Sequence, residues 1–227
     1  MRTDDRHKKQ KARNIQKKRI EQKAVLIALE DTKSSRYYFQ ALLKDKKFTG
    51  YVEFAKNIGS NPKKVLEALE KYKEDNIKTI FEKEWIVIDR DSFPNNDFFG
   101  TIETARKKNI CVAFSNESYE LWILLHFQLV SKHTSRENLN SELKRIFLSR
   151  FGLEYEKSSQ DIYSLIIGQQ SQAIKNAKVL VAKHIKDYGK IDPNKNPITM
   201  IYQLVECLNS LYSTDKDCDC FPSKGGI

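Results

Sequence analysis

Acidic residues directly follow two short apolar runs of this sequence. Glu30 comes after residues 24–29, and Asp89 and Asp91 come after residues 84–88. Short apolar runs with polar flanks are typical of buried parallel strands, whose carboxyl ends meet at one edge of a sheet. If the two strands are neighbours, the three carboxylates converge there, and they repel one another unless a hard cation neutralises them.

Mg²⁺ suits such a site because it binds a few carboxylates and keeps other positions for water and phosphate oxygens. The spacing therefore predicts that Glu30, Asp89 and Asp91 form one Mg²⁺ site, for which Mn²⁺ is a substitute. The alternative is that these acids are ordinary strand-end residues that cap helices or form salt bridges. An isolated Asp-x-Asp favours that alternative, and the equivalent placement of Glu30 leaves the two interpretations evenly balanced.

The elements that would position these acids alternate along the first half of the chain. Strand-like and helix-like patterns follow one another with short connections, which predicts a parallel sheet with helices on both faces. The residue types that favour helix N-caps are Ser34 or Ser35, Asn61 and Asn116. The predicted strands are residues 24–29, 51–55, 84–88 and 110–114, and the predicted helices follow at 34–43, 62–72, 97–108 and 117–127.

Beyond residue 130 the sequence predicts helices and no strand. The predicted helices are residues 136–151, 160–167, 170–187 and 197–212. The expected organisation is accordingly a basic N-terminal arm at 1–23, an α/β core at 24–130, a helical C-terminal part at 131–212 and a flexible tail at 213–227.

The composition is that of a globular chain, with 40% apolar and 31% charged residues among 227. A cytoplasmic location without a membrane partner is expected, because no apolar run approaches the roughly 18 residues of a membrane span. The net charge of +10 is concentrated in residues 1–23, where ten Lys or Arg stand against three acids. This arm either binds a nucleic-acid phosphate backbone or is a solvated tail.

The four cysteines fall into two pairs. Cys111 and Cys207 lie on apolar segments and are expected to be buried thiols. Cys218 and Cys220 form a Cys-x-Cys in the predicted tail, where reduced and exposed thiols are expected. Without a second Cys or His pair at zinc-site spacing, the Cys-x-Cys is a weak indication of metal binding.

Several stretches of the sequence occur together in a known family. They are residues 26–30 with Lys33 and Tyr38-Phe39, residues 85–91, residues 113–116 with 120–122 and 124–127, and a weaker set of Asn196-Pro197 with Thr199 and Leu204-Val205. In these stretches, which span residues 24–212, the chain resembles the RloB family, a branch of the Toprim-domain nucleases linked with bacterial defence against phage.

The resemblance implies a Toprim-like α/β fold in which the strand-end Glu30 acts in acid/base chemistry. Asp89 and Asp91 would hold Mg²⁺ for the cleavage of phosphodiester bonds in RNA or DNA. It also implies an ABC-type ATPase as a candidate partner, because Toprim-related defence proteins are often paired with one. Self-association is left open.

Further residues near the predicted strand ends are candidates for the same site. Glu120 lies one turn into the predicted helix at 117–127 and is the candidate fourth acidic group of the metal site. Lys33, Arg90 and Lys107 are candidate phosphate contacts, with a solvated surface position as the alternative for each. On the same helix, Trp122 and His126 lie four residues apart. We interpret them, together with the aromatic residues 37–39, as core residues.

One position departs from the family pattern. A small glycine commonly follows the Toprim glutamate, but Asp31 stands there, and Thr32 and Ser35 replace further acids of that loop. Asp31 either keeps the backbone farther from a phosphate or joins the metal site. The alternative function is therefore a non-cleaving nucleic-acid-binding or regulatory subunit of an ABC-type-ATPase defence complex.

Overall fold

The computed structural model describes residues 24–30, 33–46, 51–54, 61–90, 95–210 and 220, and within these ranges five strands form one sheet. The strands lie in the order β2-β1-β3-β4-β5, and the first four are parallel while β5 is antiparallel to β4. This arrangement confirms the predicted α/β fold. The strands are β1 (Ala24–Leu29), β2 (Tyr51–Phe54), β3 (Lys83–Asp89), β4 (Cys111–Asn116) and β5 (Ile198–Thr199).

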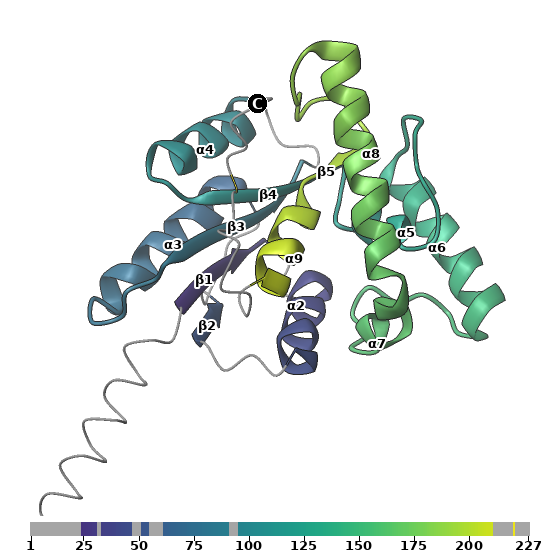
Figure 1. Cartoon of the computed structure of the whole chain (residues 1–227), viewed down its shortest axis with the longest axis horizontal. Coiled ribbons are helices and arrows are strands. Elements are labelled where there is room, and N and C mark those ends of the chain that lie inside the picture. The colour runs from purple at the N-terminus through teal and green to yellow at the C-terminus, as the bar shows by residue number, and fades with distance from the viewer. Residues whose placement is uncertain are drawn as a thin grey trace, which may run out of the picture.

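Helices cover both faces of the sheet (Figure 1). On one face, α3 (Pro62–Asp75) and α4 (Asn95–Lys107) pack against each other and against the central strands. On the other face lie α2 (Ser34–Asp45) and α9 (Ile201–Ser210). Every residue of β4 is buried, as expected for a parallel strand that is covered on both faces.

The N-cap predicted for α3 is confirmed, whereas the N-cap predicted for α2 is not. Asn61 caps α3, since its Oδ1 accepts a hydrogen bond from the Lys64 N–H at 2.9 Å and Pro62 follows at the first helical position. The expected cap of α2 is wrong. Ser34 and Ser35 are buried in the first turn of that helix, and the residue before the helix is Lys33.

The second half of the chain is helical, as predicted, except for a short strand. Ile198 and Thr199 form β5 beside Asn116 and Ser115, and the Met200 N–H donates to the Phe114 carbonyl at 2.7 Å. A strand of two residues is too short to show the alternation of buried and exposed residues by which a strand is recognised in a sequence. The strand is therefore defined only by its pairing with β4. The helices are α5 (Glu120–Leu125), α6 (Arg136–Phe151), α7 (Ile162–Ile166), a 3-10 turn η1 (Ile167–Gln169) and α8 (Gln170–Tyr188).

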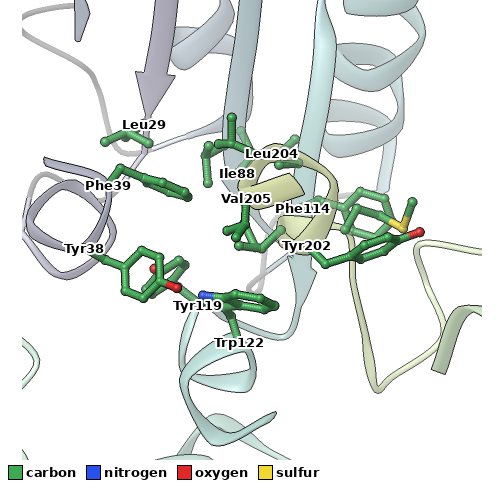
Figure 2. Packing of buried hydrophobic residues seen from close by; sticks show 14 of the residues in the cluster. Leu29, Tyr38, Phe39, Ile88, Phe114, Tyr119, Trp122, Tyr202, Leu204 and Val205 are labelled. Carbon is green, nitrogen blue, oxygen red and sulfur yellow. The ribbon is translucent and has the colours of Figure 1, made fainter. Parts of the chain in front are cut away.

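The apolar core reaches the carboxyl ends of the strands, where the acidic residues follow. Figure 2 shows Leu29, Ile88 and Phe114, from the ends of β1, β3 and β4, near aromatic side chains of α2 and α5 and apolar side chains of α9. The buried cluster continues into α6 and α8, so the sheet and the helical part share one core. Tyr38 and Phe39 belong to it, which confirms their interpretation as core residues. Tyr37 is only half-buried and is not part of the cluster, so the expectation is wrong for this residue.

The predicted basic arm lies outside the described residues, as does the predicted tail apart from Cys220. The roles of both segments therefore stay predictions. In the part of the chain that is described, no helix combines the length and the apolar character that crossing a membrane requires.

The three cysteines within the described residues are bonded rather than free. Cys111, at the start of β4, forms a disulfide with Cys220, 109 residues later in the sequence, with the two Cα atoms 5.6 Å apart. Cys207 is also disulfide-bonded. The expectation of reduced thiols at these three positions is therefore wrong. Sequence spacing did not reveal the pairing because Cys220 meets Cys111 of β4 only in the folded chain.

Replacing Cys220 with Ser is expected to lower the free energy of unfolding of the oxidised protein by about 2–4 kcal/mol, because the Cys111–Cys220 bond closes a long loop in the unfolded chain. Urea unfolding of wild type and variant measures the difference. In the presence of a thiol reductant the two proteins should unfold together. Equal stability under oxidising conditions would contradict the prediction.

Candidate active site

Glu30 and Asp89 lie at the same edge of the sheet because β1 and β3 are parallel neighbours. Leu29, the last residue of β1, pairs with Val87 of β3. Glu30 follows directly, and Asp89 ends β3, where it pairs with Ser115 of β4. The sequence left open whether the two strands are adjacent, and the structure shows that they are.

Glu30 continues the hydrogen bonding of β1 by one residue and then reaches across to β3. Its backbone N–H donates to the Val87 carbonyl at 3.0 Å, and its Oε2 accepts a hydrogen bond from the Asp89 N–H at 3.0 Å. The carboxylate of Glu30 is therefore held against the backbone that carries Asp89. Its position depends on strand pairing rather than on a flexible loop.

The carboxyl group of Asp89 lies among charges of its own sign. Burial has the largest effect, and together with the charges of Glu120 and Glu30 it raises the pKa of Asp89 well above the usual value of 3.8. A hydrogen bond from the Tyr119 backbone and the charge of Arg136 act in the opposite direction. A cation bound at this position would relieve the repulsion.

Glu120 supplies the third carboxylate at this edge. It is the first residue of α5, and its side chain is only 3% exposed. The Ser118 hydroxyl donates to Oε2 at 2.5 Å, and the Lys157 Nζ lies 2.5 Å from Oε1. Since the charge of Glu120 acts on Asp89, this candidate lies near Asp89. Its role as a metal ligand stays a prediction.

Two cations from the helical part of the chain reach this acidic edge, and sequence reasoning missed both. Lys157 lies between α6 and α7 and pairs with Glu120. Arg136 begins α6, acts electrostatically on Asp89, and donates its backbone N–H to Glu117 Oε2 at 2.7 Å. No spacing in the sequence connects them with the acids, because only the packing of α6 against α5 brings them near.

The three candidate phosphate contacts do not lie together. Arg90 follows Asp89, but its guanidinium lies over the ring of Phe98 in α4, 5.5 Å from the ring centroid. Lys33 is exposed and directly precedes α2. Lys107 is the last residue of α4, just before β4 begins, so it lies at the opposite edge of the sheet from the acids.

The segment after β4 differs from the prediction. Asn116 does not cap a helix, because α5 begins only at Glu120 and Tyr119 precedes it as the N-cap residue. Instead, the Asn116 Nδ2 donates to the Pro193 carbonyl at 2.8 Å, and the Ser115 hydroxyl is hydrogen-bonded to the Thr199 hydroxyl at 2.8 Å. Both side chains therefore hold β5 and the segment before it against β4.

His126 and Trp122 are core residues, as interpreted from the sequence. Both are buried, and the His126 Nδ1 lies 3.0 Å from the Trp122 carbonyl oxygen. Burial lowers the pKa of His126 to about 4, so the imidazole is neutral at physiological pH.

The donor set at this edge has the chemistry that Mg²⁺ requires, since all three side chains offer carboxylate oxygens, with Glu120 buried and Glu30 and Asp89 half-buried. However, the described side chains do not form a complete set of metal ligands. Among the described residues, no three His, Cys, Asp or Glu side chains are grouped so that they could hold a metal ion. Asp91 and Asp31 lie outside the described residues, so the composition of the metal site stays a prediction.

Comparison with known proteins gives one match. The sequence profile of the family described as RloB-like protein matches residues 25–208 of this chain. This range contains Glu30, Asp89 and Glu120, and also Lys157. No curated protein and no solved structure matches the chain.

Proposed function

Because this chain belongs to the RloB-like protein family, we propose that it is a Mg²⁺-dependent, Toprim-type nuclease that cleaves phosphodiester bonds in RNA or DNA as an effector of defence against phage. The observation that carries the proposal is the convergence of Glu30, Asp89 and Glu120 at the carboxyl edge of a parallel sheet. Asp91 follows two residues after Asp89 and completes the predicted set.

Each side chain has a distinct role in this proposal. Bound Mg²⁺ supplies Lewis-acid activation of water and stabilises negative charge on the phosphate. Asp89 and Asp91 hold the metal, with Glu120 as a further oxygen donor. Glu30 transfers the proton of the attacking water. Support for this role comes from its hydrogen bond to the Asp89 N–H, which keeps its carboxylate next to the metal ligands.

The raised pKa of Asp89 supports the metal role on energetic grounds. Buried carboxylates of like charge are costly in a folded protein unless they bind protons or cations. A structural role alone gives no reason to gather Glu30, Asp89 and Glu120 at one edge, because apolar or neutral side chains would fill the same space without repulsion.

Cleavage of labelled RNA and DNA pools with Mg²⁺, and with a chelator, tests the proposal. We expect Mg²⁺-dependent cleavage by the wild type, and a rate at least about 100-fold lower in Glu30→Gln, because the amide cannot accept a proton. The matched control is Glu142→Gln, which removes the same charge from an exposed ion pair on α6. Absence of cleavage, even with the products of neighbouring genes added, or full activity in Glu30→Gln, would contradict the proposal.

One observation favours the alternative, a non-cleaving nucleic-acid-binding or regulatory subunit of an ATPase complex. The described acids already bond to protein groups, since Glu120 pairs with Lys157 and Glu30 accepts from the Asp89 backbone. This alternative predicts nucleic-acid or ATPase binding that survives in a Glu30/Asp89/Asp91 triple neutral variant. Loss of both kinds of binding in that variant would count against it.

A further inference from the structure

Lys157 differs from the other lysines of the helical part because its ammonium contacts a buried acid. Its Nζ lies 2.5 Å from Glu120 Oε1, and the Glu120 side chain is 3% exposed whereas the Lys157 side chain is 46% exposed. The ammonium therefore lies on the solvent side of the Glu120 carboxylate. A ligand that approaches Glu120 from solution meets this positive charge first.

The position of Lys157 is built into the fold. The turn that carries it is closed by a hydrogen bond from the Ser159 N–H to the Glu156 carbonyl at 3.0 Å. Tyr155, two residues earlier, is buried with its ring 5.0 Å from that of Phe147 on α6. Packing of Tyr155 anchors the turn, so Lys157 is less free than a lysine on an exposed helix face.

Lys157 has a role at this edge beyond its ion pair with Glu120, because a phosphate that enters the site is repelled by the acids there. Glu30, Asp89 and Glu120 bring three acidic side chains to this edge, and a phosphodiester brings a further negative charge into their vicinity. A cation at the mouth of the site lowers that repulsion and binds the phosphate as a point charge. Arg90, the basic residue nearest in sequence to Asp89, is turned toward Phe98 instead.

We propose that Lys157 is a substrate-binding residue whose ammonium contacts a non-bridging oxygen of a nucleic-acid phosphate at the mouth of the acidic site. The ligand class, RNA or DNA, rests on the proposed function. If the carboxylates hold a metal ion, Glu120 would be one of its oxygen donors, and the Lys157 ammonium would then be available to the phosphate. The site is then composite, with acids from the sheet edge and α5, and the phosphate-binding cation from the turn between α6 and α7.

Binding to fluorescein-labelled single-stranded RNA and DNA oligonucleotides, measured by anisotropy with Ca²⁺ in place of Mg²⁺ over a series of salt concentrations, tests this role with the full chain. For Lys157→Ala we expect about a 10-fold higher Kd at low salt, and a slope of log affinity against log salt that is smaller by about 0.7. Lys157→Arg should keep most of the affinity. If RNA and DNA respond equally, the contact is to phosphate rather than to sugar or base.

Two further variants separate substrate binding from a purely structural role. Lys144→Ala removes a lysine of the same helical part whose partner, Glu154, is exposed, and it should leave the slope unchanged. Lys157→Ala leaves Glu120 buried without its cation and is expected to lower the melting temperature. The Glu120→Gln/Lys157→Ala double variant removes both charges and should regain stability without regaining the slope.

The outcomes separate this proposal from the proposed function. An unchanged slope and Kd in Lys157→Ala and in the double variant, or no binding of either oligonucleotide by the wild type, would overturn the role of Lys157. If the wild type cleaves with Mg²⁺ but Lys157→Ala has an unchanged slope, the nuclease proposal stands and the role of Lys157 is wrong. If Lys157→Ala has a reduced slope but the wild type does not cleave, Lys157 is a phosphate contact and the nuclease proposal is wrong.

Discussion

Asp89→Asn is expected to lower Mg²⁺-dependent cleavage by about 10³-fold or more and, in the same protein without metal, to raise stability. In the proposed mechanism, the loss of activity follows because an amide is a weak metal ligand and the metal would supply most of the charge stabilisation on the phosphate. The gain of stability, about 0.5–2 kcal/mol, follows because Asn keeps the shape and the hydrogen bond from Tyr119 but removes a half-buried acid beside Glu120 and Glu30.

The stability difference should depend on pH in a defined direction. The native pKa of Asp89 is raised, so below the usual value of 3.8 the carboxyl is protonated in both the folded and unfolded chain and costs nothing. As pH rises above 3.8, the unfolded chain loses its proton first, and the folded wild type loses stability relative to Asp89→Asn. The full difference is present above the native pKa.

Thermal unfolding of wild type and Asp89→Asn in chelator, at pH values from 4 to 8, measures this prediction. Addition of Mn²⁺ should stabilise the wild type more than the variant, because only the wild type retains the carboxylate. A wild type that is more stable than Asp89→Asn in chelator at neutral pH would show that Asp89 is a paired structural acid, and it would remove the energetic support for the metal site.

Trp122→Ala is expected to lower the free energy of unfolding by about 3–5 kcal/mol, the usual cost of truncating a buried tryptophan. Trp122 is fully buried on α5, and its ring packs edge-on against Tyr38 of α2 at 6.3 Å and against His126 at 5.0 Å. It thereby joins the face of the sheet to the helical part (Figure 2). For a chain of this size the melting temperature should fall by roughly 6–20 °C.

Trp122→Phe is the matched control, since it keeps an aromatic ring and should cost less than half as much. Thermal unfolding of the three proteins in chelator measures the series. Because Glu120 lies only two residues away on the same helix, Trp122→Ala should also loosen the site, so its activity should be lost at a lower temperature than in the wild type. A Trp122→Ala protein as stable as Trp122→Phe would contradict the role of Trp122 in the shared core.

The order of most helices and strands, and the edge of the sheet at which Glu30 and Asp89 lie, follow from the sequence alone. β1 begins and ends where its apolar run does, and β3 extends one residue beyond its run at each end. Asn61 caps α3 as its residue type and the following proline predict. These features are local, since burial pattern, capping and strand period depend on residues that are adjacent in the chain. The location of Glu30 and Asp89 at strand ends needed no more than this.

Contacts between distant segments were decided only by the tertiary structure. Lys157 pairs with Glu120, which lies 37 residues earlier in the sequence. The strand β5 forms because Ile198 and Thr199 pair with β4. Cys111 forms a disulfide with Cys220, 109 residues later. None of these pairs has a fixed spacing or a period that a single sequence displays. The position of the acids could therefore be predicted from the sequence. The position of Lys157 beside them depends on how α5, α6 and the turn after α6 pack together.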